Sequence, residues 1–210
     1  MARFTSSTFG KISGKHGTAI AAVRKDGLCI LKEYRIAGNP NTVGQKNQRG
    51  KFGFVMKQLN CMRPVFTVTF GGQYGINKAV ASAMKVAVSG EFPDFEMDYS
   101  KLVISTGGLM GVAQPYLKHI NPTCIKIGWN TETLTESSLS DYINLLILNP
   151  VTKMAIHKQQ IALRSDESIE IQLPDSWSVN ELHCWLYLTS PNGHSYSTSQ
   201  YISVNDSLIP

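Results

Sequence analysis

The stretch TCIKIGW at residues 123–129 decides the fold class. Its alternation places Ile125, Ile127 and Trp129 on one side of an extended chain, as in a strand with one buried face. We expect further strands at 101–105, at DYINLLIL (141–148, apolar on both faces), KMAIH (153–157), SIEIQL (168–173), HCWLYLTS (183–190) and HSYSTSQYI (194–202). Pro191-Asn192-Gly193 predicts a hairpin turn between the last two. Such a series of short strands and turns predicts an antiparallel β-sandwich of the immunoglobulin or fibronectin type over residues 91–210.

The segment before the sandwich, residues 18–90, predicts a β-hairpin followed by two helices. Asp26-Gly27 is a strong two-residue turn signal inside a hairpin at 18–35. From Val43 to about Asn60 the spacing is helical, with one apolar face formed by Phe52, Val55, Met56 and Leu59. PVFTVTFGG at 64–72 indicates a short extended run, and GINKAVASAMKVAVSG at 75–90 is the clearest helix of the chain. The predicted class is therefore α+β.

Residues 1–17 predict a flexible basic arm. They are rich in Gly, Ser, Thr and Lys, and their apolar side chains, Phe4, Phe9 and Ile12, are too far apart to form a core. We expect this arm to become ordered on a neighbouring molecule, with Lys11 and Lys15 adding positive charge. The predicted organisation is thus an arm at 1–17, a basic hairpin-and-helix region at 18–90 and an acidic sandwich at 91–210.

Charge is divided unevenly along the 210 residues. The net charge is +5 overall, but residues 1–90 carry +12 and residues 91–210 carry −7. The split indicates a face for nucleic acid, head-to-tail association of identical copies, or packing of one half on the other. The residues predicted to form the basic face are Lys46, Arg49, Lys51, Lys57 and Arg63.

An ordered series of motifs covers nearly the whole chain. SGKHG (13–17), NPNTVGQKNQRGKF (39–52), EFPDFEMDYSKLVIS (91–105) and ELHCWLYLTSPNGHSYSTSQYI (181–202) resemble the pattern of a prophage-associated family of unknown function from Bacteroidota. No activity or catalytic residue is implied by this resemblance. The N-terminal motif is similar to one used in phage structural proteins, which implies a role in assembly.

Motifs of enzymes and cofactor-binding proteins do not emerge from the sequence. There is no G-x-x-x-x-G-K-[ST] and no G-x-S-x-G, and the five histidines are scattered. The four cysteines, Cys29, Cys61, Cys124 and Cys184, lie far apart and are expected to be reduced thiols packed as small apolar groups. We predict no catalytic residue, no cofactor and no metal site.

The leading hypothesis is a non-enzymatic structural protein that self-assembles, related to phages or prophages, as a virion or filament component. One alternative is a protein that binds nucleic acid without sequence preference through its basic half. The other is a sandwich that binds a small ligand, for which Trp177 and Trp185 are the candidate residues. No apolar run is long enough to span a membrane and no signal peptide is evident. We expect cytoplasmic synthesis without a membrane partner, and a virion or extracellular assembly after release.

Overall fold

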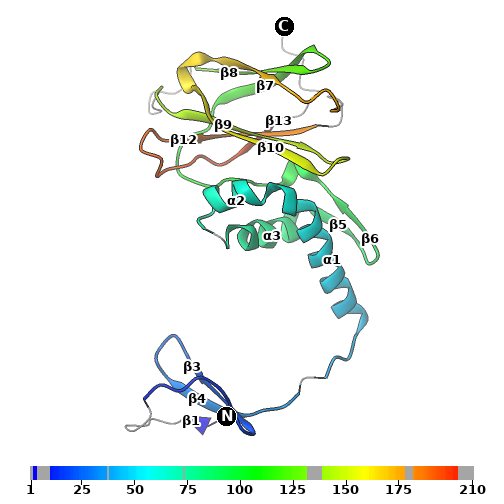
Figure 1. The fold of residues 1–210 in the computed structure, drawn as a ribbon, viewed down its shortest axis with the longest axis vertical. Coiled ribbons are helices and arrows are strands. Elements are labelled where there is room, and N and C mark those ends of the chain that lie inside the picture. The colour runs from blue at the N-terminus through cyan, green and yellow to red at the C-terminus, as the bar shows by residue number, and fades with distance from the viewer. Residues whose placement is uncertain are drawn as a thin grey trace. The chain divides into compact units, whose positions relative to one another are not determined.

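The computed structural model of the chain describes residues 2–3, 10–36, 38–72, 74–131, 139–177 and 182–202 (Figure 1). It contains two compact units, Met1–Thr42 and Val43–Pro210. The predicted boundary between residues 90 and 91 is wrong, because the helices share a hydrophobic core with the sandwich. The first boundary moves as well, since part of the predicted arm is a strand of the N-terminal unit.

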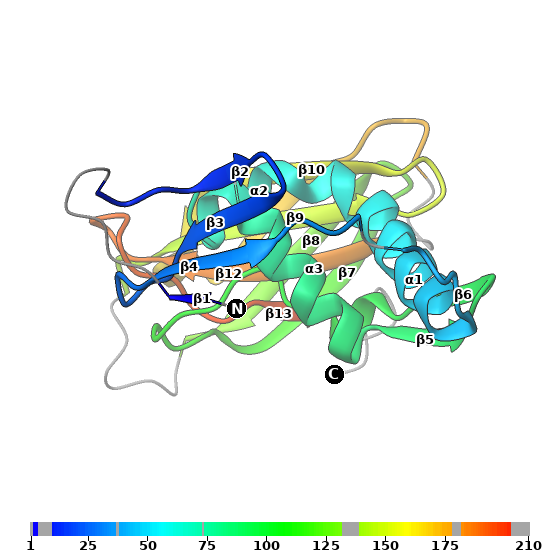
Figure 2. The same cartoon turned by 90° about the horizontal axis from the view of Figure 1, so that it is seen from below.

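The N-terminal unit is an antiparallel sheet with the strand order β1 (Ala2–Arg3), β4 (Cys29–Glu33), β3 (Ala19–Val23), β2 (Gly14–His16). Figure 2 shows β2, β3 and β4 side by side. The predicted hairpin is confirmed: Gly27 has a φ of 81°, and the backbone N–H of Leu28 donates to Oδ1 of Asp26 at 3.2 Å. Because β2 pairs with β3, residues 14–16 are not part of a free arm.

Three helices open the second unit: α1 (Val43–Leu59), α2 (Arg63–Thr69) and α3 (Gly75–Val86), with a 3-10 turn at Asn60–Met62. The helix predicted from Val43 is confirmed, although Phe52 is exposed while Val55 and Leu59 are buried. The extended run predicted at 64–72 is wrong. Pro64 stands in the first turn of α2, where its missing N–H costs nothing.

A two-stranded hairpin, β5 (Val88–Glu91) and β6 (Asp94–Met97), follows α3 and shortens that helix relative to the prediction. The Phe92-Pro93 peptide bond at its turn is cis. After a 3-10 turn at Tyr99–Lys101, residues 102–105 belong to no strand, so the strand predicted at 101–105 is wrong. The N–H of Ile104 donates instead to the Ser199 hydroxyl at 3.0 Å.

The remainder forms an antiparallel β-sandwich. One sheet has the order β10 (Met154–Leu163), β9 (Tyr142–Asn149), β12 (His183–Thr189), β13 (Gln200–Ile202). The other has the order β11 (Ser168–Gln172), β8 (Cys124–Asn130), β7 (Ala113–Asn121), and a 3-10 turn at Arg164–Asp166 links β10 to β11. Strands lie where they were predicted between residues 123 and 190, but of the strand predicted at 194–202 only Gln200–Ile202 is a strand. The sequence interpretation missed β7.

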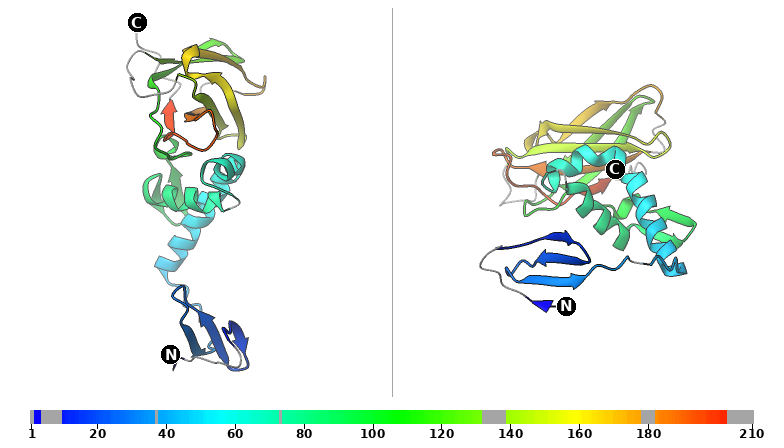
Figure 3. Two further views of the ribbon diagram at one scale, coloured as in Figure 1. Left: turned by 90° about the vertical axis from the view of Figure 1, so that its left-hand side faces the viewer. Right: turned by 60° about the horizontal axis from the view of Figure 1, so that its bottom comes forward.

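The sheet containing β9 and β12 is covered on both faces, as Figures 1 and 3 show. Leu145 and Leu186 face the other sheet, within one core. Their neighbours Leu146, Trp185 and Tyr187 belong to a second core with α1, α2 and α3. This arrangement explains why the run at 141–148 is apolar on both faces, since each face meets a different layer.

Candidate functional site

The N-terminal unit has very little core. Among its described residues, the buried apolar side chains are those of Ala21 and Cys29. Larger apolar side chains, Leu31, Tyr34 and Ile36, are exposed, Ile36 to 85%. A unit of about 40 residues needs a disulfide, a metal or a partner for stability, and Cys29 is a free thiol. The described core of this unit is therefore small for a fold of its size.

The residues predicted for the assembly arm are only partly described. Lys11 and Lys15 are exposed and Ile12 is half-buried, while Phe4 and Phe9 lie outside the described residues. Nζ of Lys15 lies 3.9 Å from the centroid of the Tyr34 ring, a cation–π geometry. The arrangement places Lys15 on the sheet itself.

One face of this sheet combines positive charge with isoleucines. The register places Lys15, Ile20 and Lys32 opposite one another in a row across β2, β3 and β4. Ile30 lies on the same face, two residues before Lys32. We call Lys15, Ile20, Ile30 and Lys32 the basic sheet face; Glu33 alternates to the opposite face.

The helical layer supplies a second basic surface. Lys46, Arg49 and Lys57 are exposed on α1, and at 3.6 residues per turn they fall within an arc of about 80°. Lys51 is half-buried and lies about 140° from Lys46 around the helix. Arg63 is exposed at the start of α2. The structure thus brings three of the five predicted residues into one stripe, in a region (34–90) without Asp or Glu.

The β5–β6 hairpin presents the opposite charge. Its register places Ser89, Glu91, Asp94 and Glu96 on one face, and all four are exposed. We call these four residues the acidic hairpin face. The other face carries the half-buried Val88, Phe95 and Met97, of which Val88 and Met97 pack on the helical core.

Contacts with α1 hold this hairpin in place. The backbone N–H of Phe92 donates to Oδ1 of Asn47 at 3.2 Å, and the rings of Phe54 and Phe95 are 5.9 Å apart. The hairpin approaches the helix so closely that a Cβ at Gly50 would lie 2.5 Å from Cδ2 of Phe92. Phe92 nevertheless remains 55% exposed at the turn.

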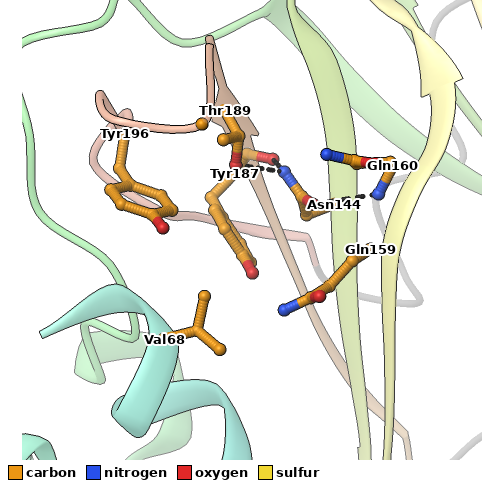
Figure 4. A pocket seen from close by; sticks show the side chains of 8 residues that line it. Val68, Asn144, Gln159, Gln160, Tyr187, Thr189 and Tyr196 are labelled. Atoms are coloured by element: carbon orange, nitrogen blue, oxygen red, sulfur yellow. Dashed lines mark hydrogen bonds between the residues drawn. The ribbon is translucent and has the colours of Figure 1, made fainter. Parts of the chain in front are cut away.

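A depression of about 140 Å³ lies between α2 and the sheet (Figure 4). Its polar groups satisfy one another: Nδ2 of Asn144 donates to Oγ1 of Thr189 at 2.8 Å, and Oδ1 of Asn144 accepts from the N–H of Gln160 at 3.0 Å. The latter bond holds the bulge of β10, where Gln160 has a φ of 50°. These amides stabilise the strand irregularity, and the depression offers few groups to a ligand.

Buried titratable groups belong to the packing. Burial lowers the pKa of His157 and of His183, whose ring nitrogens lie 2.8 Å from the Tyr187 hydroxyl and 2.7 Å from the Tyr201 hydroxyl, respectively. Burial raises the pKa of the Cys184 thiol to about 12, which leaves it unreactive at neutral pH.

The two tryptophans considered for ligand binding are buried in the cores. Trp177 belongs to the core between the sheets, and Nε1 of Trp185 donates to the Leu102 carbonyl at 3.0 Å. Neither ring is available to stack on a ligand, so that expectation for these residues is wrong.

Neither a metal-binding cluster nor a membrane-spanning helix occurs in the part of the chain that the structure describes. No cluster of three or more His, Cys, Asp or Glu side chains is arranged to hold a metal ion there. None of the helices in that part has both the length and the apolar character to cross a membrane. The four cysteines are free thiols, three of them buried and Cys61 half-buried.

Residues 11–203 match a family of unknown function, DUF6266. The chain belongs to the DUF6266 family. A search of curated proteins gives no match to this DUF6266 member. Among solved structures, the fn3 domain of human collagen alpha-1(XX) chain is similar, with 9% identity and a TM-score of 0.34. The match covers 50% of this chain and 95% of that domain.

Proposed function

We propose that this DUF6266 protein is a non-enzymatic structural protein that assembles with copies of itself, as a component of a phage- or prophage-derived virion or filament. The observation that carries the proposal is the N-terminal unit, whose described residues bury only the small side chains of Ala21 and Cys29 as apolar core. The phage connection is supported by the motif resemblance alone.

Association supplies what this unit lacks. Burying one large apolar side chain contributes roughly 1.5–3 kcal/mol, and Leu31, Tyr34 and Ile36 are exposed in the isolated chain. A neighbouring copy that covers these side chains would offset the cost of ordering the unit. The unit has charge to guide such contact, with seven Lys or Arg and two acids over residues 1–42.

We further propose that the sandwich has the fibronectin type III arrangement. Strands β7, β8 and β11 share one sheet, and β10, β9, β12 and β13 share the other. In chain order this is the first, second and fifth strand against the fourth, third, sixth and seventh. That division supports the assignment, because it matches a three-plus-four sandwich with a Greek-key crossover.

Deleting residues 2–42 tests the assembly function. The second unit contains both extended hydrophobic cores, so the truncated protein should fold and melt cooperatively while sedimenting as a monomer. The full chain should sediment as oligomers under the same conditions. A truncated protein that assembles like the full chain would contradict the proposal.

A finer variant pair keeps the chain intact. Ile36→Ser removes a side chain that is 85% exposed in the N-terminal unit and should weaken association. Val151→Ser removes one that is 67% exposed in a turn of the sandwich and should leave association unchanged. Equal effects of the two changes would argue that exposed apolar area in general, and not the N-terminal unit, drives assembly.

Nucleic acid binding is a second candidate, favoured by the stripe of Lys46, Arg49 and Lys57 on an acid-free helical layer. Changing all three to Gln should weaken binding to single- and double-stranded DNA and reduce the slope of log K against log salt by about two to three. The matched control is Lys118→Gln/Lys126→Gln/Lys158→Gln, three cations of the sandwich. Equal slopes for the two triple variants would exclude the stripe as the DNA-binding surface.

A further inference from the structure

We propose that the acidic hairpin face of one copy binds the basic sheet face of the N-terminal unit of a second copy. This inference rests on the proposed self-assembly and names the two surfaces that meet. One surface is cationic and the other anionic, and both occur once in every copy.

The basic sheet face is the donor surface of this contact, and strand register determines where its lysines lie. Lys15 and Lys32 flank Ile20 on the two strands next to β3, which places their backbones about 10 Å apart. The acids of the unit lie elsewhere, Asp26 at the hairpin turn and Glu33 on the opposite face. The face therefore offers two cations on either side of an apolar centre.

The acidic hairpin face is the acceptor surface of this contact, and the charge and spacing of its carboxylates match the two lysines. Glu91 pairs with Asp94 across the hairpin, and Glu96 lies two residues beyond Asp94. Glu91 and Glu96 are diagonal neighbours, about 7–8 Å apart, which two lysine side chains about 10 Å apart can reach. Residues 88–98 themselves contain no Lys or Arg.

The hairpin is also preorganised for docking. Its contacts with Asn47, Gly50 and Phe54 fix the backbone before any partner arrives. Phe92 projects at the turn, 55% exposed, and supplies apolar area beside the carboxylates. Aromatic side chains are enriched at protein–protein interfaces relative to the rest of the surface.

The arrangement predicts open-ended growth. The two surfaces are different, so the contact is head-to-tail and leaves one donor and one acceptor free on every dimer. Such a contact produces rings where the rotation closes and filaments where it does not. Because the pairs are partly exposed, association should weaken as salt increases.

Charge reversal tests the pairing directly in the full-length protein. The donor variant is Lys15→Glu/Lys32→Glu and the acceptor variant is Glu91→Lys/Glu96→Lys. Each variant alone should sediment as a monomer with an unchanged circular dichroism spectrum. A 1:1 mixture should assemble again, because the two unchanged surfaces attract each other across the two variants and so do the two charge-reversed surfaces. The variant with all four changes should assemble again.

The control is Lys118→Glu/Lys126→Glu, the same change of charge on the outer face of β7 and β8, and it should assemble like the natural sequence. If the donor and acceptor variants also assemble normally, or if their mixture stays monomeric, the docking proposal is wrong while self-assembly through another surface stands. If the natural sequence is itself monomeric, the proposed function fails first.

Discussion

Replacing Arg164 by Met should destabilise the second unit more than any surface change. The guanidinium and the Asp141 carboxylate are both almost fully buried, 2% and 3% exposed, with Nη1 and Oδ2 3.7 Å apart. Arg164 also donates to the carbonyls of Met110 at 3.2 Å and Gly111 at 2.5 Å. The pKa of Asp141 is raised because burial outweighs the attraction of Arg164.

The magnitude follows from what the substitution leaves behind. Removing one partner of a buried pair costs about 3–5 kcal/mol, because the other charge stays buried without compensation. Orphaned carbonyls, at about 1–3 kcal/mol each, are part of this figure and do not simply add to it. For a unit of this size, each kcal/mol lowers Tm by roughly 2–4 °C, so Arg164→Met should lower Tm by about 10 °C.

Two further variants test whether burial of the pair sets the loss of stability. Adding Asp141→Leu to Arg164→Met should recover part of the lost stability, because the uncompensated charge disappears. Lys101→Met breaks a shorter pair, 2.8 Å from Nζ to Oδ2 of Asp98, whose side chains are largely exposed; it should change the free energy of unfolding by less than about 1 kcal/mol. Differential scanning calorimetry of the chain that lacks residues 2–42 measures the Tm of Arg164→Met, of the double variant and of Lys101→Met. A loss for Lys101→Met equal to that for Arg164→Met would refute the reasoning, since burial would then not set the cost.

Other predictions concern pH and glycine. Burial lowers the folded-state pKa of His157 and His183 below the unfolded value of about 6.5; the free energy of unfolding should hold above that pH and fall as the pH drops from it toward the lowered values. Thermal melts from pH 8 to pH 5 should show this loss, and a His157→Gln/His183→Gln variant should show less of it. Gly75→Ala should destabilise by about 1–3 kcal/mol, because its Cβ would overlap the Phe66 carbonyl oxygen. Gly53→Ala, with nothing within 4 Å of its Cβ, should stabilise α1 by up to about 1 kcal/mol. Chemical denaturation measures the free energy of unfolding of both variants, and a change of the same sign for Gly75→Ala and Gly53→Ala would contradict this packing.

Local patterns identified the elements whose signal is contained in a few residues. Asp26-Gly27 and the alternation of 123–129 predicted a hairpin and a strand that the structure contains. Local patterns gave a wrong prediction where tertiary packing determines the secondary structure. PVFTVTF is rich in β-branched and aromatic residues, but burial of Val65 and Phe66 in the helical core makes it α2.

The surfaces were harder to predict than the elements. The sequence indicated a basic helix, yet only the register of β2, β3 and β4 shows that Lys15 and Lys32 flank Ile20. Nothing in the sequence around residues 88–97 reveals that Gly50 of α1 provides the space for the Phe92 ring. Contacts between distant segments decide such placements, and composition does not encode them.

The average mass of the full-length chain, measured by light scattering against concentration, tests self-assembly most directly. At low salt the mass should rise well above the 23.2 kDa of one chain as concentration increases, and it should decrease again when salt is added. A mass that stays at one chain across the whole concentration range and at low salt would contradict the proposed function.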